Sequence, residues 1–243
     1  MNTKHFLNFI LFGSQYPKWK RLFYILPLYI VCVLHYFPGI LLHHALTYRN
    51  FTIHSSEQID PAIKQVLDNS LVRLHRSEIN DSSRQHHLYL CEGYWYAKFF
   101  GLRLYRAFAW NTSHKIFIVK TDAKKDECYR NDTDHNTVSL SETIAHEIVH
   151  SFQRDQLGWY GMTTMPTWKI EGYALYVSKN ESFDLVKAKQ EIQRYKNQSS
   201  FAADYGRYDI SVLYLFRVKN FTFQKLEETP LSLEEVLTEI ETL

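Results

Sequence analysis

The chain has 243 residues, of which 45% are hydrophobic and 16% aromatic, and its formal net charge at pH 7 is +2. This size and apolar content predict one domain with a substantial core and a short appended segment. The small net charge, together with the absence of a zinc-finger cysteine pair, a P-loop and a glycine-rich dinucleotide motif, gives no indication of a nucleic-acid partner.

The N-terminal part of the sequence indicates attachment to a membrane. Residues 1–21 form a basic tail without acidic side chains, and residues 22–46 contain no Lys, Arg, Asp or Glu. Because about 20 apolar residues suffice to cross a bilayer, we expect a transmembrane helix over residues 22–46, with a buried or re-entrant segment as the alternative. By the positive-inside rule, the basic tail predicts a single-pass protein with a cytoplasmic N-terminus and residues 47–243 on the extracytoplasmic side.

The first half of residues 47–243 alternates short apolar runs with polar turns. These runs predict strands at residues 51–55, 87–91, 106–110 and 115–120. Apolar residues at helical spacing predict helices from Asp60 to about residue 76 and over residues 94–100. This part of the chain therefore mixes strands with helices.

The next segment, His146-Glu147-Ile148-Val149-His150, has the H-E-x-x-H form. Ser139 and Glu142 predict a capping box at the start of its helix, and Gly158 predicts the end. Residues i and i+4 of a helix lie on one face, about 5–6 Å apart at Cβ, so the two histidines can bind one zinc ion together. The glutamate beside the first histidine can then take a proton from water instead of binding the metal.

A catalytic zinc needs a third protein ligand and an open position. A second helix is predicted after Pro166, and Glu171 lies in it, far enough past His150 for a turn and an antiparallel return. Gly172 beside it would let two helices approach closely. Glu171 is therefore the candidate third ligand, and the alternative is a solvated carboxylate on a helix surface.

The pair H-E-I-V-H and W-x-x-E-G-Y-A resembles the gluzincins, the superfamily of thermolysin and aminopeptidase N. The resemblance covers about residues 139–216 and implies a zincin-like α+β fold and a zinc metallopeptidase that acts on peptides or proteins. It implies zinc ligation by His146, His150 and Glu171, with Glu147 as general base. No G-x-M-E-N exopeptidase motif is present, so the resemblance does not extend to aminopeptidase specificity.

The same resemblance suggests two further features of the site. In the aminopeptidase N branch a tyrosine that opens a helix donates a hydrogen bond to the oxyanion, and Tyr208 aligns best with that residue, with Tyr205 as second choice. Both tyrosines also suit a core position at a helix start. Gluzincins also resemble one another in a strand that precedes the metal helix and pairs with extended substrate, and residues 115–120 are the candidate here. An ordinary sheet strand is the alternative for this segment.

The rest of the sequence is mostly helical in pattern. Helices are predicted over residues 183–196, 209–219 and 233–240, with Ser232 and Glu235 as the capping box of the last. Strands and helices in the first half, followed by helices in the second, predict an α+β fold. If the domain is extracytoplasmic, Cys91 and Cys128 are expected to form a disulfide, and two buried thiols are the alternative.

Three functions are compatible with these motifs. A zinc metallopeptidase accounts best for the complete set of ligands and base. A zincin-like binding or structural module without activity is the first alternative, which a fourth protein ligand at the metal would favour. A zinc hydrolase acting on a non-peptide bond is the second.

Overall fold

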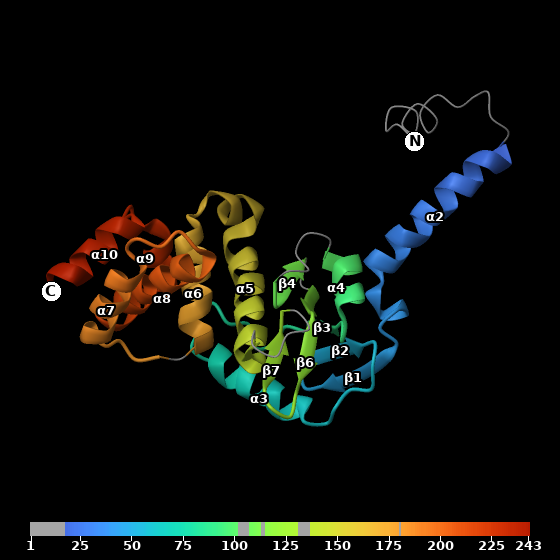
Figure 1. Ribbon diagram of the computed structural model, residues 1–243, viewed down its shortest axis with the longest axis horizontal. Helices are drawn as coiled ribbons and strands as arrows, with labels where there is room; N and C mark the ends of the chain where they lie inside the picture. Colours follow the sequence, from blue (N-terminus) through green and yellow to red (C-terminus); the bar gives the residue numbers. More distant parts are fainter. Residues whose placement is uncertain (1–17, 102–106, 113–114, 131–136, 180) are drawn as a thin grey trace.

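The computed structural model describes residues 18–101, 107–112, 115–130, 137–179 and 181–243 of the chain. Its strands all precede residue 140, and helices fill the remainder, as Figure 1 shows. The expected α+β fold, with a mixed sheet and a helical C-terminal half, is therefore confirmed.

A five-stranded mixed sheet has the order β1-β2-β3-β5-β4. Strands β2 (Phe51–Ser55), β3 (His86–Leu90) and β5 (Lys115–Ile118) are parallel to one another. The outer strands β1 (His44–Tyr48) and β4 (Ala109–Thr112) pair antiparallel with β2 and β5. A second, antiparallel sheet follows and consists of β6 (Lys120–Asp122), β7 (Glu127–Tyr129) and β8 (Thr137–Ser139).

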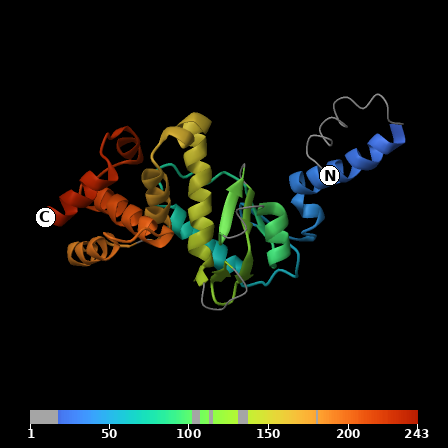
Figure 2. The same ribbon diagram turned by 45° about the horizontal axis from the view of Figure 1, so that its top comes forward.

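The mixed sheet separates two hydrophobic clusters. Leu88, Ile116 and Ile118 are fully or almost fully buried in the larger cluster, with α3 (Ile63–Leu74) and α5 (Leu140–Thr164). On the other face, the ring of Phe117 stacks on Tyr89 at 4.9 Å and on Trp110 at 5.3 Å between centroids. Helix α4 (Tyr94–Gly101) covers these rings, and Figure 2 shows the strands between α5 and α4.

The C-terminal helices pack beside α5. They are α6 (Thr167–Lys179), α7 (Leu185–Tyr195), α8 (Phe201–Arg217), α9 (Phe223–Glu228) and α10 (Leu233–Thr242). Helix α6 contacts both α5 and α8 and so lies between them. Ser232 and Glu235 form the capping box expected at the start of α10.

The N-terminal segment differs from the expected single span over residues 22–46. Helix α2 (Lys18–Tyr36) ends before Pro38, which has no backbone N–H and opens a short 3-10 turn, η1 (Pro38–Ile40). Leu42 is then fully buried, and residues 44–46 belong to strand β1 instead of a span. Across the part of the chain that the structure describes, no helix combines the length and the apolar character needed to cross a membrane.

The expected disulfide is also wrong, because Cys91 and Cys128 are both free and buried. They cannot meet, since Cys91 belongs to the hydrophobic cluster on the α4 face of the sheet and Cys128 to the cluster that contains α5. Burial raises the pKa of the Cys91 thiol strongly and that of the Cys128 thiol to about 12. Both are therefore neutral and unreactive in the folded chain.

This burial predicts a selective pattern of thiol modification. Iodoacetamide at neutral pH should modify Cys32, which is exposed, and should leave Cys91 and Cys128 unmodified until urea unfolds the chain. Peptide mass mapping with and without urea measures this. A disulfide-linked peptide pair, or rapid modification of either buried thiol under native conditions, would contradict the structure.

Candidate metal centre

Helix α5 is anchored at its N-terminus by side chains from two directions. The Ser139 hydroxyl accepts a hydrogen bond from the Glu142 amide at 3.2 Å. Asp126, from the turn before β7, accepts one from the Ser141 amide at 2.7 Å and places a negative charge where the helix dipole favours it. The expected capping box is only half present, because the Glu142 carboxylate pairs with Arg73 at 3.2 Å.

Gly158 breaks the regular course of α5. Its backbone has φ 67° and ψ −179°, a conformation that glycine adopts without the strain of a Cβ. The first section of the helix ends here, as the sequence predicts, but helical turns resume and run to Thr164. The metal motif thus lies in the straight section before the kink.

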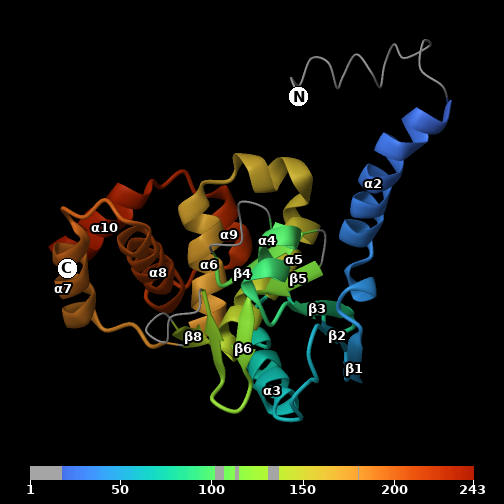
Figure 3. The same ribbon diagram turned by 45° about the vertical axis from the view of Figure 1, so that its right-hand side comes forward.

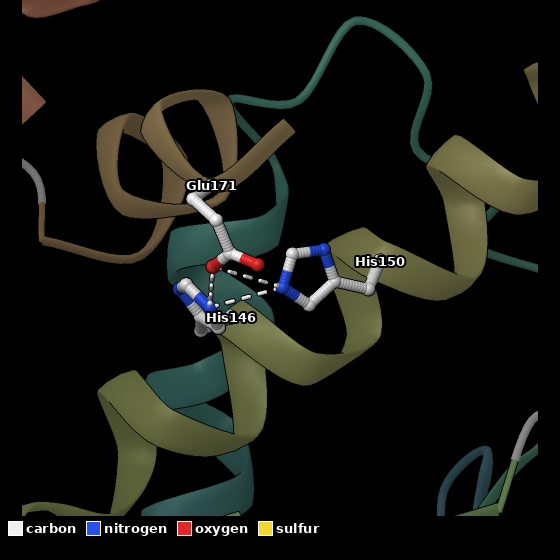
Figure 4. Close-up of side chains that lie close together, drawn as sticks. All are labelled: His146, His150 and Glu171. Carbon is white, nitrogen blue, oxygen red and sulfur yellow. Dashed lines mark hydrogen bonds and ion pairs between the residues drawn. The ribbon is translucent and has the colours of Figure 1, made fainter. Parts of the chain in front are cut away.

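Three side chains from two helices converge beside this section, as Figure 4 shows. His146 and His150 project from α5, and their Nε2 atoms are 3.0 Å apart. The Oε2 atom of Glu171, from α6, lies 3.3 Å from the Nε2 of His146 and 3.5 Å from that of His150. Their side chains are between 13% and 19% exposed, so solvent reaches the cluster only partly.

The distances and donor types in this cluster fit a zinc ion. Tetrahedral zinc with bonds of about 2.0–2.1 Å holds two ligand atoms about 3.3 Å apart. The three separations between the ligand atoms, 3.0, 3.3 and 3.5 Å, lie around this value. Two imidazole nitrogens and one carboxylate oxygen are ligands that zinc accepts, and three protein ligands leave its fourth position open.

Charge in the cluster is distributed so that Glu171 is ionised. Burial alone would raise the pKa of Glu171, but hydrogen bonds and positive charge from the two histidines hold it far below its usual range. Burial alone would lower the pKa of His150, but the Glu171 and Glu147 carboxylates raise it to about 9. The structure therefore presents a carboxylate ligand in its binding form.

Glu147 follows His146 on α5 and remains outside the ligand cluster. Burial raises the pKa of its carboxyl above the usual range, although the positive charge of the two histidines acts in the opposite direction. A carboxyl with a raised pKa beside a candidate metal site suits a general base, because it can both accept and return a proton.

Gln153 supports the cluster and was not singled out from the sequence. Its side chain is fully buried, and its Oε1 lies 2.8 Å from the Nδ1 of His150. Its Nε2 donates to the Ile170 carbonyl at 2.9 Å. With Nδ1–H donating to Gln153, the ring of His150 is held so that its Nε2 is the atom available to a metal once it has lost its proton. The spacing from His150 was an available signal, because residues three apart share a helix face.

The structure brings Tyr205 to the ligand cluster. Its hydroxyl donates to the Oε2 of Glu171 at 2.9 Å. Burial and the negative charge of Glu171 raise the pKa of Tyr205, so it remains a neutral donor. Tyr208 lies beside it, with ring centroids 5.9 Å apart. Among the described residues, no hydrogen bond joins Tyr208 to one of the three candidate metal ligands. The second choice from the sequence thus makes the contact.

The strand beside the metal helix is β4. Residues 115–118 form β5, which pairs with β3 on one side and β4 on the other. The alternative of an ordinary sheet strand therefore fits this segment, in place of a strand that pairs with substrate. Strand β4 ends the sheet among the described strands. Asn111 of β4 donates to the Glu147 carbonyl and to the Ser151 hydroxyl, both at 2.7 Å, and so fixes this edge against α5.

Comparisons with known proteins add no relative: no family model, curated protein or solved structure matches the chain.

The buried amide of Gln153 generates a stability prediction. Gln153→Met keeps the side-chain volume but leaves the Ile170 carbonyl and the His150 Nδ1 without this partner, so the free energy of unfolding should fall by about 1–3 kcal/mol. Urea denaturation measures the change. Gln193→Met is the matched control, because Gln193 makes an exposed contact with Glu241 and its loss should change stability by less than about 0.5 kcal/mol. Equal stability of the two variants would contradict the role of Gln153.

Proposed function

We propose that the chain is a zinc-dependent metallopeptidase of the gluzincin type that hydrolyses peptide bonds. The observation that carries the proposal is the convergence of His146, His150 and Glu171 with zinc-compatible separations of 3.0–3.5 Å. The position of Glu147 on the same helix, directly after the first histidine, supports catalysis in addition to binding.

The roles of the side chains follow from their positions. When bound by the three ligands, zinc supplies a Lewis acid that polarises a carbonyl group and lowers the pKa of water. Glu147 accepts the proton of the attacking water and returns it to the leaving amine. The Tyr205 hydroxyl donates to the Oε2 of Glu171 in the structure. In the proposed reaction it turns to the carbonyl oxygen as negative charge develops there, a contribution of about 3–4 kcal/mol for a well-positioned donor.

The edge of β4 is suited to an extended peptide. A strand at a sheet edge offers unpaired backbone N–H and C=O groups, with which an extended substrate can pair as an added strand. Asn111 of β4 donates to the backbone carbonyl of Glu147, so a peptide on β4 would lie near the section of α5 that carries the general base. This position supports a peptide as substrate.

The open coordination position favours an enzyme over a structural metal module. A structural zinc site has four protein ligands. Within the described parts of the chain, the group of His, Cys, Asp and Glu side chains that can hold a metal contains His146, His150 and Glu171 alone. This leaves room for a substrate or water.

Substitutions at the metal centre separate binding from catalysis. His146→Ala and Glu171→Ala should each reduce bound zinc from about one ion per chain to almost none, whereas Glu147→Gln should retain the zinc and lose at least about a hundredfold in turnover. Metal analysis of the purified chain and cleavage of a peptide library by mass spectrometry measure these effects. Full zinc content in Glu171→Ala would exclude Glu171 as a ligand, and an active Glu147→Gln variant would exclude the proposed base.

The two tyrosines provide a matched pair for the hydrogen-bond donor. Tyr205→Phe should lower kcat by about a hundredfold to a thousandfold with little change in KM, because the bond to the oxyanion forms only in the transition state. Tyr208→Phe removes an equivalent hydroxyl three residues later and should change kcat by less than about threefold. Steady-state kinetics of the zinc-loaded variants decide between them, and the reverse result would return the role to Tyr208.

The substrate can be identified with the same base variant. Proteome-wide comparison of cleavage products between the unmodified chain and Glu147→Ala should yield peptides with new termini only where Glu147 is intact. The absence of any such peptide, together with full zinc content, would favour a binding module.

A further inference from the structure

Among the described residues, the exposed Trp and Tyr side chains are confined to three elements. Every exposed Trp or Tyr among the described residues lies on α2, on α4 or in α5 after Gly158. They are Tyr29, Tyr36, Tyr94, Trp95, Trp159 and Tyr160, and we call them the aromatic surface. Trp159 is 80% exposed and Tyr160 is 74% exposed, although burying such large rings would stabilise the chain.

Helices α2 and α4 lie next to each other, and the end of α5 lies apart from them. In Figures 1 and 3, α2 and the end of α5 extend toward the top of the view, whereas α4 lies nearer its middle. The end of α2 rests on α4, because the ring of His35 is 6.1 Å from that of Phe99 and 6.0 Å from that of Phe100. Helices α2 and α4, which are separate in the sequence, are thus in direct contact.

Aliphatic side chains extend this surface along α2. Leu26, Ile30 and Val31 are each close to half exposed. Phe37, just before η1, is 56% exposed, and Ile40, in η1, is 58% exposed. The exposed apolar side chains that follow one another along α2 and the turn after it mark an interaction site, since water solvates them poorly.

The charges on these elements are all of one sign. The charged residues of α2 and α4 are all Lys or Arg, and η1 and residues 158–164 contain no Lys, Arg, Asp or Glu. Lys115 adds a further positive charge, because its Nζ lies 4.8 Å from the centre of the Tyr36 ring. Such a surface is complementary to a layer of negative charge.

We propose that the aromatic surface docks on a lipid bilayer with anionic headgroups. Trp and Tyr favour the boundary between headgroups and acyl chains, where the ring is apolar and the N–H or O–H remains hydrated. Basic side chains near that boundary strengthen binding to an anionic membrane. A protein partner fits less well, because the rim of a protein interface commonly offers polar groups of both signs.

Docking would place the metal helix at the membrane. Trp159 and Tyr160 directly follow the section of α5 that carries His146 and His150, so the end of the metal helix contacts the headgroups. The inference does not rest on the metal or on catalysis, since only exposed side chains and charge support it.

Quenching by brominated lipids tests which tryptophans enter the bilayer. The full chain is added to vesicles of phosphatidylcholine and phosphatidylserine whose acyl chains carry bromine, and tryptophan emission is recorded. Emission should be quenched, and Trp95→Phe and Trp159→Phe should each reduce the quenched fraction. Trp110→Phe is the control, because Trp110 is 5% exposed and should contribute no quenched emission. Quenching that neither Trp95→Phe nor Trp159→Phe reduces would overturn the proposal.

Affinity provides an independent measurement. Replacing Trp159 and Tyr160 together by Ser should weaken binding to these vesicles by about tenfold, through lost apolar burial. Phe201→Ser should leave binding unchanged, because Phe201 is 70% exposed on α8 and lies outside the aromatic surface. Binding should also weaken in pure phosphatidylcholine vesicles and at high salt. Absence of flotation with vesicles would overturn the proposal. Self-association of the chain that the Trp159 and Tyr160 double variant abolishes would assign the surface to a second copy instead.

Discussion

The close packing of α6 between α5 and α8 is the constraint on which the metal centre depends. Gly172, next to Glu171, makes this packing possible: a Cβ there would lie 2.5 Å from a side-chain carbon of Val212 and 2.7 Å from the Tyr208 carbonyl oxygen. Any larger residue would move α8 away from α6, and with it the Tyr205 hydroxyl that contacts Glu171. On the other side, Gln153 fixes α6 to α5 through the Ile170 carbonyl. The third ligand is thus held from two sides.

Helix α5 stabilises the fold with one face and carries the polar cluster on another. Ile144 and Ile148 are fully buried in the core, and Phe152 is 2% exposed. Burying each such side chain contributes about 1.5–3 kcal/mol relative to leaving it in water. This stabilisation offsets the cost of holding two mostly buried histidines beside a carboxylate. The polar groups also contact one another, so none of the cluster is an isolated buried charge. The apolar face thereby permits a reactive arrangement on the opposite one.

Local patterns in the sequence were sufficient where the structure depends on helix periodicity. The spacing of His146 and His150 fixes their common face whatever surrounds the helix, and Gly172 beside Glu171 indicated a close approach of helices. Two predictions that required long-range information were wrong, although the structure does bring Glu171 to the two histidines. Cys91 and Cys128 lie in different hydrophobic clusters, and residues 44–46 pair with β2 after a proline-initiated turn ends the apolar helix. Pro38 is a residue-type signal for the end of that helix. The separation of the two cysteines leaves no signal in residue type or spacing.

The two remaining discrepancies, at the tyrosines and at the edge strand, have one physical origin. Tyr205 and Tyr208 lie on nearly the same face of α8, but three residues separate them by about 4.5 Å along the helix axis. Only the position of α8 along α6 decides which hydroxyl meets Glu171, and side-chain packing at Gly172 and Val212 sets that position. In the same way, β4 and β5 form one hairpin, and the sequence of a hairpin does not state which strand continues the sheet. The parallel pairing of β5 with β3 turns β4 outward to α5, where Asn111 secures it. Local sequence thus shows which residues could take part in the chemistry. Which of two similar candidates does so, such as Tyr205 or Tyr208, depends on packing between elements that are distant in the chain.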